Sequence, residues 1–137
     1  MIDYIKGQSK YLENIHISWY GGEPLLAFDI IKRMLEAIMK MCKEKDIKYN
    51  SSIVTNGYNL NRDIAIKLKK ININSIQITL GGNEEMHNKR RPLKNGQGTF
   101  HKILDNLSKS VDVLPNISLR INIDKKILMK LILSYRS

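Results

Sequence analysis

The sequence predicts an α/β protein in which parallel strands alternate with helices. Four short apolar-rich segments recur along the chain, at about residues 15–20, 49–55, 73–80 and 117–123. The stretches between them place apolar residues at helical spacing. Strands that alternate with amphipathic helices form a parallel sheet, because each helix is a right-handed crossover between neighbouring strands. The 137 residues contain no repeat and no interdomain linker, so residues 1–137 are expected to form one domain.

The chain opens with a predicted helix at residues 1–13, ahead of the first strand. The strand breaks at Gly21 and Gly22, and the carboxyl group of Glu23 follows. Pro24 suits the first turn of the next helix, because the missing N–H would have no helical partner there. The junction between the first strand and this helix therefore exposes bare backbone beside one acid.

The second helix carries an apolar stripe opposite a lysine-rich face. The stripe consists of Ile31, Met34, Leu35, Ile38 and Cys42. Cys42 is the single cysteine of the chain, so it is expected to be a thiol on the core side. One cysteine can neither form an internal disulfide nor hold a zinc ion or an iron–sulfur cluster by itself.

The second half of the chain contains two further helices and one long loop. Asn56-Gly57 ends the second strand, and Asn61 is predicted to cap the third helix. A polar, irregular segment is expected over residues 81–98, and loops of this length are usually functional or disordered. Thr99 is predicted to cap the fourth helix, and residues 125–134 could begin another helix after the fourth strand.

The charge balance is basic, with a formal net charge of +10. This balance favours an anionic partner, such as nucleic acid, an anionic membrane surface or an acidic substrate. The lysines are scattered along helices and loops, so compositional bias explains the charge as well. No apolar run approaches the length that crosses a bilayer, and the first residues lack the regions of a secretion signal. We therefore expect a soluble, cytoplasmic protein with no membrane partner.

The predicted strands bring a set of polar residues and glycines to one edge of the sheet. In a parallel α/β unit the loops that follow the strands share one edge, and ligands bind there. The set comprises Gly21, Gly22, Glu23, Thr55, Asn56, Gly57, Thr79, Gly81, Gly82, Arg120 and Asn122. Each glycine pair or Asn-Gly pair alone also suits an ordinary turn. Their convergence at one edge makes a ligand site as good an explanation as ordinary turns, without indicating which ligand.

Six motifs in this chain occur in the order and spacing of radical S-adenosylmethionine enzymes. They are Trp19-Tyr-Gly-Gly-Glu-Pro-Leu-Leu26, Thr55-Asn-Gly57, Ile76-Gln-Ile-Thr-Leu-Gly-Gly82, His87-Asn-Lys-Arg-Arg-Pro-Leu93, Gly96-Gln-Gly-Thr-Phe100 and Leu119-Arg-Ile-Asn-Ile-Asp124. The chain most resembles the branch with SPASM-type C-terminal domains, which includes sulfatase maturases and peptide thioether synthases. The resemblance runs from about Ile15 to Asp124.

The resemblance implies a partial or full (β/α)6 barrel and an enzyme that modifies peptides or proteins. Such enzymes use a [4Fe–4S] cluster and a reductant to cleave S-adenosylmethionine into a 5′-deoxyadenosyl radical. The residues implied to bind the cofactor are Gly21, Gly22, Glu23, Asn56, Thr79, Arg91, Arg120 and Asn122. The glycines and Glu23 would meet the amino group of the methionine part, and Thr79 would face the ribose or the carboxylate. Arg91, rather than Arg90, would pair with the cofactor carboxylate.

Two departures from the family qualify this expectation. The family's Cys-x-x-x-Cys-x-x-Cys loop, which ligates the cluster, is absent from the 137 residues, and no SPASM-type cysteine cluster follows the fourth strand. The family usually has Leu-Asp-Gly where this chain has Leu80-Gly81-Gly82. We therefore expect a truncated radical S-adenosylmethionine domain that is inactive alone and calls for a complementing chain. Such a piece is expected to expose an unpaired strand edge and an apolar interior face.

Two alternatives remain at this point. The chain could be a non-catalytic remnant that binds S-adenosylmethionine or a peptide at the same edge. It could also be a basic module that binds RNA or another anion. The last reading ranks lowest, because aromatic residues make up only 7% of the chain and are not interleaved with the basic residues.

Overall fold

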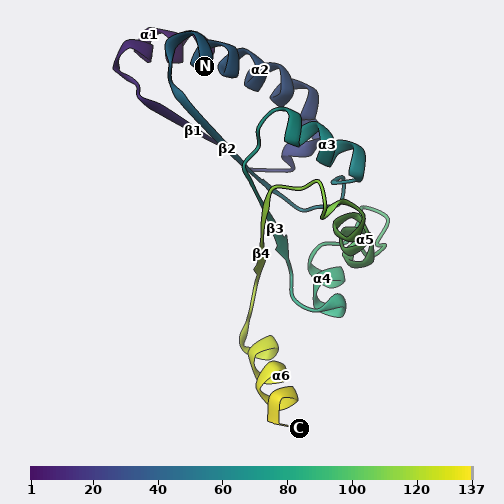
Figure 1. Ribbon diagram of the computed structural model, residues 1–137. Coiled ribbons are helices and arrows are strands. Elements are labelled where there is room, and N and C mark those ends of the chain that lie inside the picture. The colour runs from purple at the N-terminus through teal and green to yellow at the C-terminus, as the bar shows by residue number, and fades with distance from the viewer. Residues whose placement is uncertain (137) are drawn as a thin grey trace.

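The computed structural model describes residues 1–136 and contains one parallel sheet with helices between its strands (Figure 1). The elements are α1 (Ile2–Gln8), η1 (Ser9–Tyr11), β1 (Asn14–Trp19), η2 (Pro24–Ala27), α2 (Phe28–Lys45), β2 (Lys48–Thr55), α3 (Arg62–Lys70), β3 (Ser75–Leu80), α4 (Glu84–Arg90), α5 (Phe100–Ser110), β4 (Asn116–Ile121) and α6 (Lys125–Arg136). The strands lie in the order β1-β2-β3-β4, and each neighbouring pair is parallel. The predicted fold class, a partial α/β barrel, is confirmed.

Two local predictions differ from the structure. The segment expected to be irregular over residues 81–98 contains the short helix α4, whose first turn is capped by the side chain of Asn83. Thr99 lies at the N-cap position of α5, but its side-chain oxygen accepts no amide of the helix, and its hydroxyl donates to the carbonyl of Arg91. The side-chain oxygen of Asn88 accepts the first two amides of that helix end, those of Thr99 and Phe100. Thr99 is therefore the N-cap residue as predicted, but the side-chain oxygen that accepts the first amides comes from Asn88 of the preceding helix.

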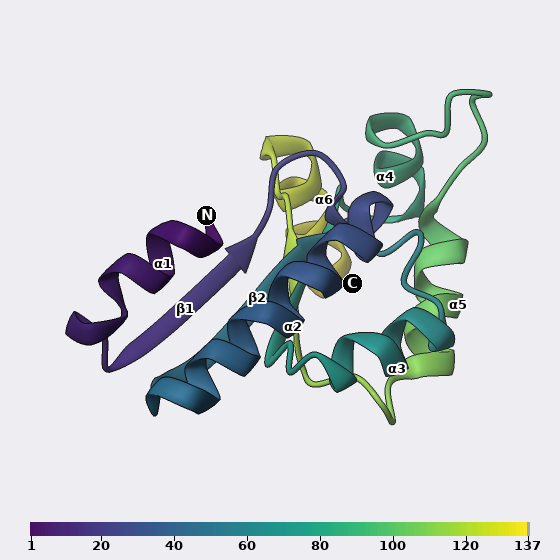
Figure 2. The ribbon, with the colours of Figure 1, turned by 90° about the horizontal axis from the view of Figure 1, so that it is seen from above.

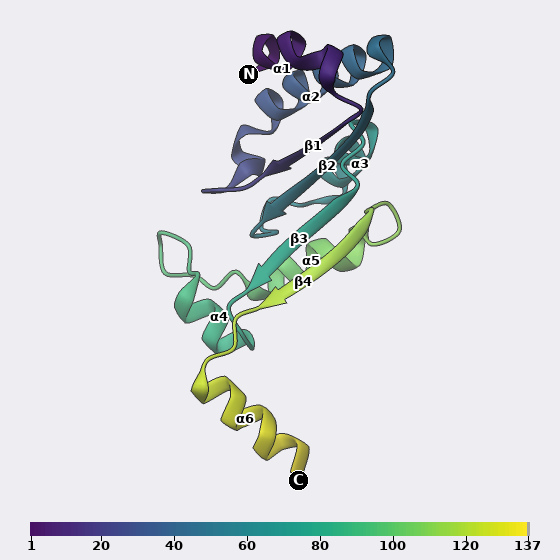
Figure 3. The same ribbon diagram turned by 90° about the vertical axis from the view of Figure 1, so that its left-hand side faces the viewer.

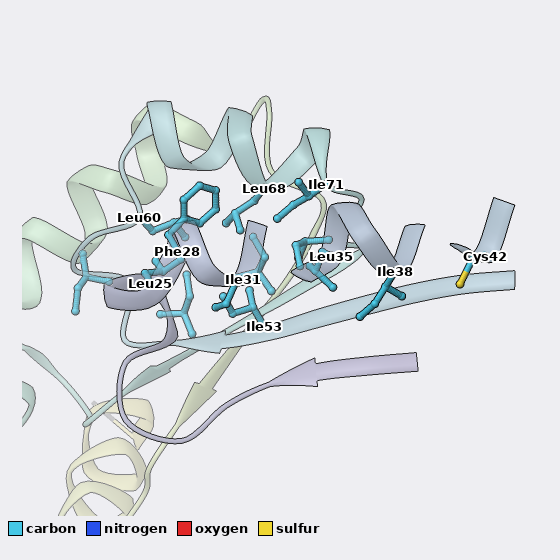
Figure 4. Packing of buried hydrophobic residues seen from close by; sticks show 14 of the residues in the cluster. Leu25, Phe28, Ile31, Leu35, Ile38, Cys42, Ile53, Leu60, Leu68 and Ile71 are labelled. Carbon is cyan, nitrogen blue, oxygen red and sulfur yellow. The ribbon is translucent and has the colours of Figure 1, made fainter. Parts of the chain in front are cut away.

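The apolar core lies on one side of the sheet, between the strands and helices α2, α3 and α5 (Figures 1 and 2). Leu35 and Ile38 of α2 are fully buried against Ile53 of β2, and Leu68 of α3 joins them (Figure 4). Cys42 belongs to the same cluster, as its place in the stripe predicted. Burial of these side chains is the main stabilising term for the fold, because it removes apolar surface from water.

Within residues 1–136, the other side of the sheet carries no helix, and it is polar. Residues that alternate with the core positions face this side. They are Asn14, His16, Ser18, Lys48, Asn50, Ser52, Val54, Ser75, Gln77, Thr79, Asn116, Ser118 and Arg120. The expected apolar interior face is therefore wrong, because Val54 is the one apolar member of this set. His16 even forms a polar cluster there, with its Nε2 3.0 Å from Ser18 Oγ and 3.2 Å from Ser52 Oγ.

Exposed apolar surface gathers instead at the β4 end of the molecule. Leu119 and Ile121 are half exposed on the core side of β4, where the covering helices end. Helix α6 projects away from the rest of the chain (Figures 1 and 3), and Leu133 is 61% exposed on it. Strands β1 and β4 are the two edges of the described sheet. None of the helices in the described part of the chain is long and apolar enough to cross a membrane.

Candidate functional site

A pocket of about 370 Å³ opens where β1, β2 and β3 end. It is lined by Gly21, Gly22, Glu23, Val54, Thr55, Asn56, Thr79 and Arg91. The first three residues follow β1, the next three end β2, Thr79 lies near the end of β3, and Arg91 follows α4. The pocket therefore occupies the edge at which parallel α/β proteins bind their ligands.

Six of the eight residues predicted to bind a cofactor line this pocket, and Arg120 and Asn122 do not. Arg120 lies one strand further along the sheet, paired in register with Thr79. The backbone of Asn122 is bonded to the end of β3, with its N–H 3.1 Å from the Leu80 carbonyl. Arg120 thus lies on β4 and Asn122 directly after it, beside the pocket rather than in its lining. The cofactor contacts of all eight residues remain predictions.

Two lining residues were not among those predicted to bind a cofactor. Thr55 belonged to the polar edge set, since it ends β2, but its role as a partner of Glu23 depends on a contact between loops 32 residues apart. Val54 is apolar, and the alternation of β2 places it on the open face of the sheet, where it lines the pocket wall.

The carboxylate of Glu23 joins the loops that follow β1 and β2. Its Oε1 accepts a hydrogen bond of 2.5 Å from the Thr55 hydroxyl and one of 3.2 Å from the Leu25 amide. Its Oε2 accepts one of 2.8 Å from the Asn56 amide. A carboxylate offers roughly four lone-pair sites, so three donors orient it and leave capacity for a ligand donor. The same carboxylate caps η2, which explains why the helix begins directly after it.

Gly21 makes the turn out of β1 possible. Its φ of +99° lies in the region that favours glycine, because side chains with a Cβ clash there. This turn brings Gly22 and Glu23 back over the sheet edge. The sequence pattern Gly-Gly-Glu thus has a conformational reason as well as a chemical one.

The two adjacent arginines, Arg90 and Arg91, have different surroundings. Arg90 donates to the carbonyl of Gly81 at 2.9 Å and pairs with the carboxylate of Asp124. Arg91 lines the pocket and makes no ion pair within residues 1–136. Pro92 disfavours continuation of α4, so the backbone of Arg91 is not helical, with φ −136° and ψ 56°. The geometry therefore agrees with the choice of Arg91 over Arg90 as the arginine at the ligand site.

Gly81 occupies the position at which the family pattern has an acid. A Cβ at this residue would lie 3.1 Å from Cα of His87, so α4 packs directly on the backbone at the end of β3. The glycine thus matches the close approach of the helix in this chain. The loop keeps a defined geometry without the acid.

Residues 1–126 match the family model described as the Radical SAM superfamily. The chain belongs to the radical SAM superfamily. It is 34% identical, over 96 residues, to the cysteine-type anaerobic sulfatase-maturating enzyme of Clostridium novyi (strain NT). The aligned segment covers 69% of this chain and 25% of the relative. It is 30% identical, over 111 residues, to the serine-type anaerobic sulfatase-maturating enzyme of Klebsiella aerogenes. That aligned segment covers 81% of this chain and 26% of the relative.

The fold is also similar to that of solved structures. One is described as native anSMEcpe with bound AdoMet and Kp18Cys peptide. Its TM-score is 0.74 at 21% sequence identity, over 86% of this chain and 33% of that chain. The chain thus spans about a quarter to a third of the length of the relatives and structures that it matches.

The described residues do not fit an iron–sulfur cluster. The single cysteine, Cys42, is 2% exposed in the apolar core, and burial raises the pKa of its thiol. A raised pKa disfavours the thiolate, which is the form that binds metal. Within the described part of the chain, no group of three His, Cys, Asp or Glu side chains could hold a metal ion. The cluster that radical SAM enzymes use would need ligands from outside these 137 residues.

The contact between Gly81 and α4 predicts that Gly81→Ala destabilises the protein by about 1–3 kcal/mol, because an added methyl forces the backbone of α4 to shift. Gly22→Ala is the matched control, since its Cβ would meet nothing within 4 Å. Urea unfolding of both variants checks this prediction. Equal stability of the two variants would contradict the prediction, because α4 would then shift without a cost in stability.

Proposed function

We propose that this chain forms the S-adenosylmethionine-binding part of a radical SAM enzyme that modifies peptides or proteins. The observation that carries the proposal is one pocket, at the carboxyl edge of a parallel sheet, that contains Gly21-Gly22-Glu23, Asn56, Thr79 and Arg91. In this superfamily a reduced [4Fe–4S] cluster supplies the electron that cleaves the cofactor. The residues of this chain would bind and orient the cofactor.

The charges in the pocket suit the methionine end of S-adenosylmethionine. That end is a zwitterion, with an ammonium and a carboxylate on the same carbon. Glu23 offers an oriented carboxylate for the ammonium, and Arg91 offers a guanidinium that can bind a carboxylate through two parallel hydrogen bonds. The hydroxyl of Thr79 lies on the same wall, where it can bond to the ribose or to the carboxylate. The side-chain NH2 of Asn56 offers one further donor, because its backbone N–H is bonded to Glu23 and its side-chain oxygen to the Tyr58 amide.

A peptide or protein substrate is supported by the relatives and by the polar face of the sheet. Two relatives are sulfatase-maturating enzymes, and one similar structure is described as holding a peptide. The uncovered face presents hydroxyls, amides and the His16–Ser18–Ser52 cluster next to the pocket edge. Such groups can bond to the backbone of an extended peptide. A reductant of the cluster would be a further partner of the complete enzyme.

We further propose that this chain alone does not cleave S-adenosylmethionine, because its one cysteine is buried in the core. Catalysis would then require a complementing polypeptide that brings the cluster. The surfaces that such a polypeptide would cover are the open edge of β1 and the exposed apolar residues of β4 and α6. By itself, the chain would act as a binder of S-adenosylmethionine or peptide, which is the second candidate function.

The pocket assignment predicts weaker binding of S-adenosylmethionine when either charge is removed. Glu23→Gln and Arg91→Gln should each raise the dissociation constant by about tenfold or more, because each removes one charge-assisted contact. Arg33→Gln is the control, because this arginine is exposed on α2 and does not line the pocket. Isothermal titration calorimetry measures all three variants. An Arg33→Gln loss as large as the Arg91→Gln loss would contradict the assignment, and so would a wild-type chain that does not bind.

The second part of the proposal predicts that the chain produces no 5′-deoxyadenosine. The assay treats the chain anaerobically with iron, sulfide and dithionite, adds S-adenosylmethionine, and follows 5′-deoxyadenosine by liquid chromatography. A complete radical SAM enzyme treated in the same way is the positive control. Production of 5′-deoxyadenosine by the chain alone, above the level of a Cys42→Ala control, would overturn this part of the proposal.

A further inference from the structure

We infer that the buried His87, as a neutral ring with its proton on Nε2, positions Arg91 in the pocket through a relay of hydrogen bonds from Gly81 to the Arg91 carbonyl. His87 does not line the pocket itself, so it is a positioning residue. The inference rests on the proposed function for the role of Arg91. The relay itself rests on the geometry alone.

The relay connects the end of β3, the helix α4 and the start of α5. The His87 side chain is fully buried. The amide of Gly81 donates to its Nδ1 at 3.0 Å, and its Nε2 lies 2.8 Å from the hydroxyl oxygen of Thr99. The Thr99 hydroxyl donates in turn to the carbonyl of Arg91 at 2.8 Å.

One arrangement of protons satisfies all three bonds. Nδ1 of His87 accepts from a backbone N–H, so it carries no proton. Thr99 has one hydroxyl proton, and the Arg91 carbonyl takes it. The Thr99 oxygen must therefore accept from His87, which places the ring proton on Nε2.

The relay holds both backbone polar groups of Arg91. The Arg91 amide donates to the carbonyl of His87 at 2.8 Å, and its own carbonyl receives the Thr99 hydroxyl. Thr99 is itself held, because its amide donates to Asn88. The ring of Phe100 packs edge-on against His87, with the ring centres 5.6 Å apart. Hydrogen bonds at both its N–H and its carbonyl thus fix the backbone of Arg91, from which the side chain extends.

The charges around His87 favour the neutral ring. Burial, and then the nearby Arg91 guanidinium, lower the pKa of His87 from its ordinary value of 6.5. Gly81 at the end of β3, and Thr99 and Phe100 at the start of α5, bring no charge to it. His101, the next residue of α5, is exposed and bonds to Glu84. A protonated ring would also aim a second N–H at the Gly81 amide, so acid breaks the relay.

The first test measures the affinity of the full chain for S-adenosylmethionine by calorimetry at pH 7.5. Thr99→Val removes the hydroxyl at nearly constant volume and should weaken binding about tenfold. Thr99→Ser keeps the hydroxyl and should stay within about twofold of wild type. Equal affinity of the Val and Ser variants would overturn the inference. A wild-type chain that binds nothing would overturn the proposed function instead, and the second test would still decide the relay.

The second test reads the ring directly, by nitrogen NMR of the wild-type chain labelled with ¹⁵N-histidine. At pH 7 the relay requires a protonated Nε2 and an unprotonated Nδ1 at His87, and this pattern should persist below pH 6.5. His16 and His101, which are exposed, serve as internal references. A His87 ring that is charged at pH 7, or that carries its proton on Nδ1, would overturn the inference even if the variants fail to fold.

Discussion

The carboxylate of Glu23 is the interaction on which the site depends. It accepts hydrogen bonds from the Thr55 hydroxyl and from the amides of Leu25 and Asn56. The parallel sheet brings the ends of β1 and β2 together, but the loops beyond a strand have no ladder to align them. One acid with three donors supplies that alignment. Such charge-assisted bonds are about twice as strong as neutral ones, so the pocket wall is held before any ligand arrives.

The two sides of the sheet differ in polarity. Helices cover one side of the sheet and enclose the core, whereas the other side is polar almost throughout. A polar face can stay in water or meet a polar substrate without a packed partner. Exposed apolar side chains remain at β4 and α6, and also beside the pocket, where Tyr20 and Leu26 flank Gly21–Glu23 and are each 78% exposed. The polar face of the sheet is therefore distinct from the exposed apolar side chains, one group of which borders the pocket.

The strands and the pocket edge could be predicted from the sequence, because both follow from local patterns. Apolar alternation and the glycines after the strands located β1, β2 and β3 to within about two residues. Helix α4 was missed because it is polar, although Asn83 followed by two acids is a start signal for a helix. The partners of Glu23, His87 and Thr99 could not be predicted, since they come from segments that meet only in the folded chain.

The central claim, that the Glu23–Arg91 pocket receives S-adenosylmethionine, is tested most directly by NMR of the ¹⁵N-labelled chain during titration with the cofactor. The account predicts that the amide signals of Gly21, Gly22, Asn56, Thr79 and Arg91 shift together, with one dissociation constant. Shifts confined to the lysine-rich outer faces of α2 and α3, with the pocket amides unchanged, would contradict it.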